Sequence, residues 1–374
     1  MNPSHPVARR GSALAANLGL SERVFASSAD RAMAKAIDEG IERVEAGLLR
    51  EVSFADSIAD VSTRYLLEAG GKRVRPMLTL LTAQLGAGAN DDVVMAAQAI
   101  EITHLGSLYH DDVMDDSERR RGVPSAQTVW GNSVAILTGD LLFARASQLM
   151  ARLGERAISM QADTFERLVL GQLHETVGPT NGEDPIAHYI QVLADKTGSL
   201  IAAAAQSGIV FSGADPAFEK PIVEFGEKIG VAFQLIDDVI DLSPQPEETG
   251  KVPGTDLRAG VVTLPLLRLA ELAKSDAASA DLLDRIERDV IVIANPVNGF
   301  DPHDTNTLAS RIVPSRETVD AIVAELRTHE ATRATLAEAH RWARDAVTAL
   351  APLPQGSVKK ALTRFAETIV ERQS

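Results

Sequence analysis

Cysteine is absent from the 374-residue sequence, which excludes disulfide bonds, thiolate nucleophiles, Cys-ligated zinc and iron–sulfur clusters. This absence is what we expect of a cytoplasmic protein. Long hydrophobic runs are also missing, since no stretch approaches the roughly 18 apolar residues of a membrane span. Near its start the chain has Arg9 and Arg10 followed by a polar stretch, unlike the apolar core of a signal peptide. We therefore expect no stable membrane insertion.

Basic residues are scarce relative to acidic ones. The chain has 37 Lys and Arg against 52 Asp and Glu, for a formal net charge of −15. Such a protein does not attract nucleic acid or anionic lipid through its long-range field. We expect no nucleic-acid partner, and any polyanionic substrate must be bound by local clusters of cations or through a metal ion.

Strand-like alternation is nearly absent, whereas apolar residues recur at helical spacing from about residue 30 onward. Breakers containing Gly and Pro separate these stretches, and no linker divides the middle of the chain. We predict an all-α fold, a single-domain helical bundle. The predicted boundaries are a loosely ordered extension at 1–29, one domain at 30–374, and within it a long loop insertion at 293–315.

Two aspartate-rich segments carry the strongest chemical signal. Segments 111–115 and 237–241 both have the pattern Asp-Asp-x-x-Asp. The aspartates are Asp111, Asp112, Asp115, Asp237, Asp238 and Asp241. On a helix, positions i, i+1 and i+4 lie within about 100° of one another, so each motif presents three carboxylates on one face. Like charges so placed destabilise a helix, and each motif follows an apolar stretch, so a solvated acidic face explains them poorly.

Carboxylate clusters that contain no His or Cys suit a hard cation such as Mg²⁺, which commonly also binds substrate phosphates. We therefore predict Mg²⁺ as the cofactor. A phosphorylated substrate also needs fixed cations, and two clusters supply them. One is segment 72–75, after the glycine pair 70–71, and the other is the arginine run 119–121 after the first aspartate motif.

These motifs together carry a family resemblance. In order, the chain contains Gly-Gly-Lys-Arg-x-Arg-Pro (70–76), His-x-x-x-x-x-His-Asp-Asp-x-x-Asp (104–115), Arg-Arg-Gly (120–122), Gly-Asp (139–140), Lys-Thr-Gly (196–198), Phe-Gln-x-x-Asp-Asp-x-x-Asp (233–241) and Gly-Lys (250–251). From about residue 30 to its end it resembles the trans-isoprenyl diphosphate synthases, also called the polyprenyl synthetase family. The resemblance implies helices around a central cavity, the two aspartate motifs facing each other across its mouth, and a homodimer.

The resemblance also implies roles for single residues. The six aspartates match the metal-binding positions. Isopentenyl diphosphate-binding positions are matched by Lys72, Arg75, His104 and Arg121. Positions that contact the allylic diphosphate are matched by Arg120, Lys196 and Lys251. Positions near the forming allylic cation are matched by Thr197 and Gln234. The predicted catalytic set is Asp111, Asp112, Asp115, Asp237, Asp238, Lys196, Thr197 and Gln234.

The implied activity is a Mg²⁺-dependent prenyltransferase that condenses isopentenyl diphosphate with an allylic diphosphate in successive head-to-tail steps and releases pyrophosphate. The chain departs from the family pattern at one position. Val261 stands where the family has a lysine in Gly-Lys-x-Thr-Leu-Pro, since segment 260–265 reads Gly-Val-Val-Thr-Leu-Pro. We expect this change to weaken binding of the allylic diphosphate rather than to alter the reaction.

Product length is partly encoded before the first aspartate motif. The growing tail is expected to run along the helix that carries Asp111, where one turn of about 5.4 Å is comparable to one five-carbon unit. Gly106, Ser107 and Thr103 are small, and Tyr109 points about 160° away from Asp111. We predict an open tunnel and a medium-to-long all-trans product, around octaprenyl or nonaprenyl, of the kind used for quinone side chains. Gly106→Phe is then expected to shorten the product.

The sequence leaves several alternative functions open. A short-chain farnesyl or geranylgeranyl diphosphate synthase would need a plug from another helix or from a partner chain. A non-catalytic subunit of a heteromeric synthase is disfavoured because both aspartate motifs are intact. A metal-dependent HD-type phosphohydrolase would use His110 and Asp111, but it needs further His ligands and leaves the other motifs without a role. Terpene cyclases have a different second metal motif.

Overall fold

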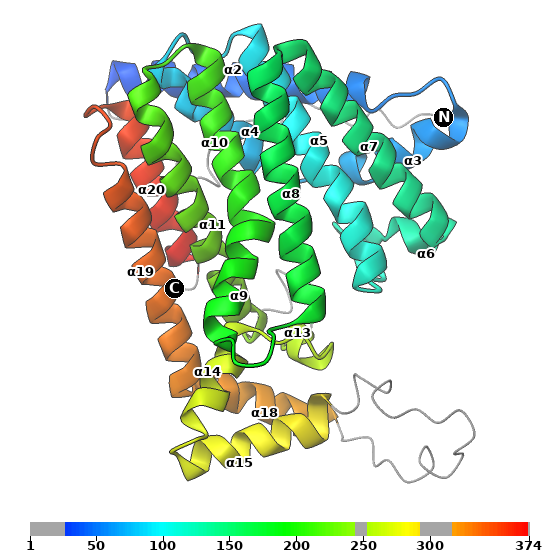
Figure 1. Cartoon of the computed structure of the whole chain (residues 1–374), viewed down its shortest axis with the longest axis vertical. Coiled ribbons are helices and arrows are strands. Elements are labelled where there is room, and N and C mark those ends of the chain that lie inside the picture. Colours follow the sequence, from blue (N-terminus) through cyan, green and yellow to red (C-terminus); the bar gives the residue numbers. More distant parts are fainter. Residues whose placement is uncertain (1–26, 244–252, 292–315, 373–374) are drawn as a thin grey trace. The chain divides into compact units, whose positions relative to one another are not determined.

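The computed structural model describes residues 27–243, 253–291 and 316–372. Most of these residues are helical and few are in strands, which confirms the predicted all-α fold (Figure 1). The first helix, α2 (Ser28–Glu51), begins two residues before the predicted domain start, because the Ser27 hydroxyl accepts from the backbone N–H of Asp30 and forms a capping box with it. The predicted loop at 293–315, Lys251 and residues 1–26 of the predicted extension lie outside the described residues.

The chain divides into two compact units. The first comprises residues 1–170, 195–230 and 345–368, and the second comprises 171–194, 231–344 and 369–374. Each boundary falls inside a helix, which explains why the sequence shows no linker. These helices are α8 (Glu155–Val177), the π-helical turn η3 (Ala194–Gly198), α11 (Glu219–Asp241), α19 (Glu330–Ala349) and α20 (Ser357–Glu371). The single domain that the sequence predicts stays a prediction.

The first unit is built around α5 (Asp91–Met114), which packs against α2, α4, α7 and α10. Helix α5 is buried on nearly all sides, because its middle carries apolar and small residues without a polar face. The other elements of this unit are α3 (Ser57–Glu68), α4 (Val74–Thr82), η2 (Ala83–Leu85), β1 (Arg119–Arg120), β2 (Val123–Pro124), α6 (Ala126–Trp130), α7 (Asn132–Leu153), α10 (Ser199–Ser212) and η4 (Pro216–Phe218).

Small and hydroxylated residues allow the helices of the first unit to approach closely. The hydroxyls of Thr79 and Thr82 on α4 donate to the carbonyls of Ala204 and Ala205 on α10, each at 2.8 Å. On the same interface a Cβ added to Gly208 would come within 2.8 Å of the backbone nitrogen of Ala83. The helix around 199–211, which the sequence shows as the longest apolar segment, is therefore a core helix of this unit.

The second unit has its own apolar core. Its elements are α9 (Pro185–Leu193), α13 (Thr255–Arg258), α14 (Leu264–Leu272), α15 (Ala277–Ile286), the π-helical turn η5 (Glu287–Ile291) and α18 (Arg316–Thr328). The core is formed by Leu242, Leu257, Leu266, Leu269, Leu282, Ile286, Val290, Val319, Ile322, Val323, Leu326 and Ala331. This unit holds the second aspartate motif, at the end of α11, against α13 and α14.

Among the described residues, one helix is long and apolar enough to cross a membrane by length and composition. It is α7, and 39% of its most apolar window is buried within the protein.

Candidate active site

The first aspartate motif lies at the C-terminal end of α5. Asp111 and Asp112 belong to the last turn of the helix, and Asp115 follows as its C-cap, its N–H donating to the carbonyl of Asp111 at 2.8 Å. Only two of the three predicted carboxylates are thus on the helix itself. The C-terminal end of a helix dipole is negative, and the last turn of α5 contains no basic residue. Carboxylates at this end favour the binding of a cation.

Asp112 is fully buried and paired with Arg120. Its Oδ1 accepts from Nε of Arg120 at 2.7 Å, while its Oδ2 is buried without a hydrogen-bond partner. Burial raises the pKa of Asp112, and Arg120 opposes that shift. Arg120 is held in place by a short antiparallel ladder in which it pairs with Val123. The structure therefore brings Arg120, from the arginine run 119–121, against the first aspartate motif.

The second cation cluster lies beside the same helix. Burial lowers the pKa of Arg75 to about 10, and Nε of Arg75 is buried with no hydrogen-bond partner. Burial, and then the nearby cations, of which Arg75 has the largest effect, lower the pKa of His104 well below its usual value. Arg121 donates to the carbonyl oxygens of Leu66, at 2.7 Å, and Gly70. Positive charge is therefore concentrated around an imidazole that is neutral at pH 7.

Lys72 is exposed at the start of this cluster. It shares the 70–76 segment with Arg75, at the N-terminal end of α4. The predicted isopentenyl diphosphate-binding residues Lys72, Arg75, His104 and Arg121 are thus all in the first unit. A desolvated guanidinium with an unused donor is a binding site for an anion.

Lys196 and Thr197 lie in a π-helical turn, η3 (Ala194–Gly198), between α9 and α10. Such turns are rare and frequently occur at functional sites. This one is fixed by Arg167 of α8, which donates to Asp195 at 2.9 Å and to Glu227 of α11. Gly198 then approaches α11 closely, since an added Cβ would lie 2.9 Å from the carbonyl of Glu227.

The second aspartate motif ends α11 as the first ends α5. Asp238 is buried, and its Oδ2 accepts from the Tyr189 hydroxyl at 2.9 Å and from the N–H of Leu264 at 3.5 Å. Burial raises the pKa of Asp238 to about 8, opposed by these two hydrogen bonds. The carboxylate of Asp241 accepts from the N–H of Asp256 at 3.1 Å. The middle aspartate of each motif is therefore held by protein groups.

Asp237 and Gln234 also lie on α11, whereas Lys251 lies outside the described residues. Asp237 is partly exposed and lies 3.6 Å from Arg372, whose guanidinium also covers the ring of Phe233 at 5.1 Å. Gln234 is one turn earlier on the same helix. The two motifs belong to different units, so their facing each other stays a prediction.

The carboxylates fit a metal ion that shares its coordination with another ligand. Among the described residues, no group of three or more His, Asp and Glu side chains is already arranged around one point. At each helix C-terminus, taken by itself, the oxygen donors suit a hard divalent cation that keeps waters or phosphate oxygens, and at α5 they include the orphaned Oδ2 of Asp112.

The sequence did not identify two residues that support the site, Tyr189 and Glu101. Tyr189 holds Asp238, and the buried ion pair of Arg73 and Glu101 lies under the cation cluster. A signal for Glu101 exists in the sequence, because it is a charged residue inside the apolar stretch that leads to the first aspartate motif. Nothing comparable distinguishes Tyr189.

The residues predicted to control chain length do not all share one surface. Gly106 faces α7, where an added Cβ would approach both the carbonyl oxygen of Gly139 and the ring of Phe143 to 3.2 Å. Gly106 therefore allows α5 and α7 to pack closely. Neither Gly106 nor Ser107 lines the cavity found beside α5, whereas Thr103 does.

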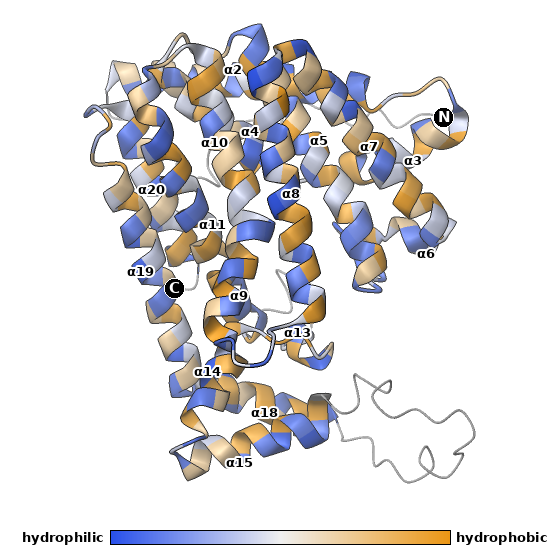
Figure 2. Cartoon of the chain, viewed as in Figure 1, coloured by the Kyte–Doolittle hydropathy of each residue, from blue (hydrophilic) through white to orange (hydrophobic). Residues whose placement is uncertain are grey.

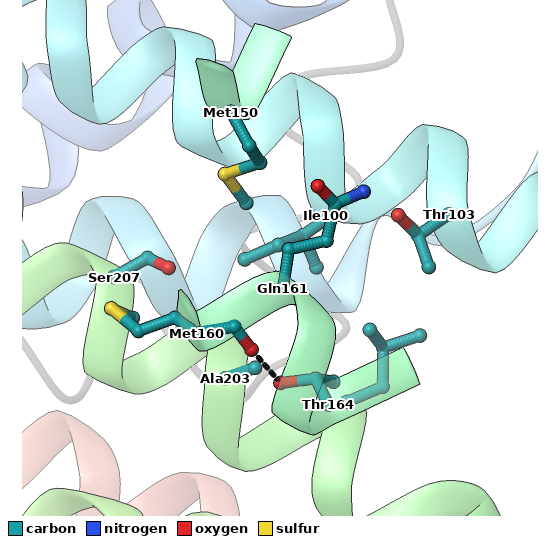
Figure 3. A pocket seen from close by; sticks show the side chains of 9 residues that line it. Ile100, Thr103, Met150, Met160, Gln161, Thr164, Ala203 and Ser207 are labelled. Atoms are coloured by element: carbon teal, nitrogen blue, oxygen red, sulfur yellow. Dashed lines mark hydrogen bonds between the residues drawn. The ribbon is translucent and has the colours of Figure 1, made fainter. Parts of the chain in front are cut away.

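This cavity has a volume of about 20 Å³, room for about one water molecule. It lies among α5, α7, α8 and α10, all within the first unit (Figure 3). Its lining is Ile100, Thr103, Met150, Met160, Gln161, Thr164, Leu200, Ala203 and Ser207. The hydroxyl of Ser207 is buried and has no hydrogen-bond partner.

Comparisons of the sequence and of the structure with known proteins give the same result. A family model described as "Polyprenyl synthetase" matches residues 57–292. A nonaprenyl diphosphate synthase of Mycobacterium tuberculosis is 47% identical over 250 residues, which cover 67% of this chain and 75% of the relative.

Two solved structures share the fold. A polyprenyl synthase from Caulobacter crescentus superimposes with a TM-score of 0.77 at 30% identity, covering 93% of this chain and 98% of the other. A geranylgeranyl pyrophosphate synthase from Corynebacterium glutamicum gives a TM-score of 0.74 at 37% identity, with coverage of 93% and 98%. Both are complexed with calcium and isoprenyl diphosphate.

Proposed function

Because the chain belongs to the polyprenyl synthetase family and is a prenyltransferase, we propose that it makes a medium-to-long all-trans polyprenyl diphosphate, around octaprenyl or nonaprenyl. Its substrates are isopentenyl diphosphate and an allylic diphosphate, added in successive head-to-tail steps with release of pyrophosphate. The observation that carries this proposal is the buried cation cluster beside an aspartate motif at the end of α5. The name of the Mycobacterium tuberculosis relative supports the product length.

We assign the metal-binding role first to the outer aspartates of each motif. The middle ones, Asp112 and Asp238, are buried and already bonded to Arg120 and Tyr189, so they fix the orientation of the motifs. Asp111 and Asp115 in the first motif, and Asp237 and Asp241 in the second, are the more exposed carboxylates, and we assign them to the cation. When bound, Mg²⁺ neutralises the allylic diphosphate and so favours its departure.

The diphosphate of isopentenyl diphosphate binds to Lys72, Arg75 and Arg121, with His104 donating a hydrogen bond as a neutral imidazole. The buried Nε of Arg75 supplies a donor that no protein group uses. Cations held in a desolvated site bind an anion more strongly than exposed ones, because water does not screen them. These residues fix the orientation of the isopentenyl double bond toward the allylic carbon.

We assign Arg120, Lys196 and Lys251 to the binding of the allylic diphosphate. Thr197 and Gln234 are assigned to the surroundings of the allylic cation, where their polar side chains stabilise developing positive charge. The π-helical turn that carries Lys196 and Thr197 is held from α8 by Arg167, which donates to Asp195 in the same turn. The double bond of isopentenyl diphosphate attacks the allylic carbon as pyrophosphate leaves. The departed pyrophosphate is the base that then takes the proton whose loss restores a double bond.

The growing tail is directed along α5 toward the cavity that Thr103 lines. The walls include Met150 and Met160, whose unbranched side chains adapt to a ligand more readily than branched ones. We infer that the side chains around this cavity of about 20 Å³ rearrange to admit the tail, and that the cavity contributes to length control.

A product assay tests the proposal. The purified chain is incubated with Mg²⁺, labelled isopentenyl diphosphate and a farnesyl diphosphate primer, with an EDTA-treated sample as the control. We expect elongation with pyrophosphate release, ending near octaprenyl or nonaprenyl diphosphate. Products no longer than geranylgeranyl diphosphate would contradict the chain length, orthophosphate release would indicate a phosphohydrolase, and inactivity until a partner is added would indicate a subunit.

We also propose that the protein is a cytoplasmic homodimer. Exposed apolar residues gather on α6, α7 and α8 within the first unit, and Figure 2 shows hydrophobic residues along both α7 and α8. They are Val129, Ile136, Leu137, Leu141, Ile158, Val169 and Leu170. An apolar helix that is only 39% buried requires a covering surface, and a second copy of the chain supplies one.

Replacing Leu137 and Leu141 by Glu is expected to convert the dimer to a monomer. These side chains lie one helical turn apart and are 62% and 37% exposed, so charge there disrupts an interface without disturbing the core. Light scattering coupled to size-exclusion chromatography measures the mass. Val61→Glu on α3, where Val61 is 53% exposed, is the control and should leave the mass unchanged. A wild-type monomer at micromolar concentration would contradict the assignment.

A further inference from the structure

Three residues other than glycine have a positive φ among the residues that the structure describes. They are Arg73 (51°), Asp116 (49°) and Arg121 (52°). Side chains disfavour this left-handed region, so such a conformation persists only where surrounding contacts impose it. Arg73 and Arg121 belong to the two cation clusters, and Asp116 directly follows the first aspartate motif. The backbone strain at these residues is therefore concentrated at the candidate active site. Of the three residues, Arg73 has the most side-chain hydrogen bonds.

The Arg73 side chain is held by hydrogen bonds to two glutamates and two backbone carbonyls. Its Nε donates to Glu45 of α2 at 2.8 Å, and its Nη1 donates to Glu101 of α5 at 3.2 Å. The same guanidinium donates to the carbonyl oxygens of Gly70 at 3.2 Å and Leu67 at 3.3 Å. Arg73 and Glu101 are 4% and 3% exposed. One side chain thus connects α2, α5 and the backbone that precedes α4.

The connected backbone is the segment that carries the cations. The carbonyl of Gly70 accepts from both Arg73 and Arg121. Gly71 lies between the two guanidinium groups, where an added Cβ would clash with that of Arg73 and approach that of Arg121 to 3.0 Å. Lys72 immediately precedes Arg73, and Arg75 follows two residues later. A displacement of Arg73 therefore moves all three predicted diphosphate ligands.

Glu101 also supplies negative charge beneath the cluster. Burial lowers the pKa of Arg75 and of Arg121, and in both cases Glu101 gives the largest opposing contribution. Buried cations without a counter-charge repel one another, and the segment would then open toward solvent. Glu101 lies three residues before His104 on the same helix, so it lies below the site rather than in it.

We propose that Arg73 and Glu101 form a buried positioning pair, which holds the 70–75 segment so that Lys72, Arg75 and Arg121 meet the diphosphate of isopentenyl diphosphate together. Neither member of the pair contacts substrate. The inference rests on the proposed function, and it adds a specific consequence: loss of the pair impairs the use of isopentenyl diphosphate selectively, while the allylic substrate is bound as before.

Steady-state kinetics of Glu101→Gln and Arg73→Lys test this inference. Each substrate is varied at saturating concentrations of the other. We expect the KM for isopentenyl diphosphate to rise about 10-fold or more, because a misplacement of about 1 Å is enough for losses of up to 10²-fold. The KM for the allylic diphosphate should stay within about 2-fold of wild type. Arg73→Lys keeps the charge but loses the planar fork, so it does not restore the geometry.

A double-variant cycle and a matched control separate positioning from stability. If the two residues act as one unit, the variant that carries both changes should raise the KM for isopentenyl diphosphate no further than either single change. Arg64→Lys on α3, where Arg64 pairs with Glu68 and Asp60 at the surface, is the control and should leave both KM values unchanged. Glu45→Gln is the substitute if a variant fails to fold, since Glu45 is the more exposed partner.

Two results would overturn the inference. Equal rises in both KM values together with a lowered Tm would show that the pair only stabilises the fold. An unchanged KM for isopentenyl diphosphate in folded variants would show that it does not position the segment. A wild-type chain that does not elongate the allylic primer would instead refute the proposed function, so the two failures are distinguishable.

Discussion

Asp111→Asn and Asp237→Asn are each expected to lower kcat for condensation by about 10³-fold or more. Each change removes a charged oxygen ligand from a metal that stabilises the departing diphosphate, and the loss of one preorganised electrostatic contact typically costs about 10²–10³-fold. Asn keeps the size of the side chain, so the helix ends should fold as before. The rate of labelled isopentenyl diphosphate incorporation at saturating Mg²⁺ measures the effect.

The position of each aspartate at a helix C-terminus sharpens this expectation. The negative end of the dipole adds to the carboxylates, so removal of one charge should also raise the Mg²⁺ concentration needed for half-maximal activity. Asp92→Asn provides the matched control, because Asp92 is an exposed aspartate in the first turn of the same α5. It should keep near-normal activity. Near-normal turnover in Asp111→Asn would remove the first motif from the metal site.

Asp112→Asn is expected to act differently from Asp111→Asn. Asp112 is fully buried, and its carboxylate is bonded to Arg120 at 2.7 Å. Removing its charge leaves a guanidinium without its partner, so we expect reduced stability together with reduced activity. A melting curve should therefore separate the variants: Asp111→Asn close to wild type, Asp112→Asn lower.

Thr103→Phe is expected to shorten the product to about farnesyl or geranylgeranyl diphosphate. Thr103 lies eight residues before Asp111 on α5, about 12 Å along the helix axis, which is close to two or three five-carbon units. The aromatic ring would fill the cavity of about 20 Å³ and block the path beyond it. Chromatography of the dephosphorylated products measures the length.

The cost in stability and the control are part of this test. The larger side chain overfills a packed site, so we expect a loss of about 1–3 kcal/mol, measured by denaturant unfolding. Thr103→Val is the control, because it keeps the volume and removes only a hydroxyl that donates to Ala99 of the same helix. Its product should match wild type. An unchanged product length in a folded Thr103→Phe variant would place the tail elsewhere.

Gly106 shows what sequence reasoning leaves open, and its role in chain length stays a prediction. As a small residue five positions before Asp111 it is predicted to face an open tunnel, but it packs against Gly139 and Phe143 of α7. Gly106→Phe would therefore disrupt the α5–α7 contact rather than plug a tunnel. Helical periodicity defines which residues share a face of α5, but it does not determine which neighbouring helix or cavity covers that face.

Burial of charge was likewise not predictable from the residue types. The three aspartates of each motif are equivalent in the sequence, yet Asp112 and Asp238 are buried against protein donors while the outer ones remain partly or fully exposed. Tyr189, which holds Asp238, is 49 residues away in the chain. Such distant partners are brought together only by packing.

The sequence by itself determines the all-α fold, the two carboxylate motifs, the cation clusters and, through them, the family and its chemistry, because these depend on local periodicity and on residue types at fixed spacing. The deficit of positive charge means that a polyanionic substrate must be bound by local cations or through a metal ion. The lack of cysteine excludes a thiolate as nucleophile or ligand. Only the tertiary structure decides which cations are desolvated and strained, which aspartates are fixed by the protein and where a tail finds space, because burial, left-handed backbone and close helix contacts arise from segments that are remote in the chain.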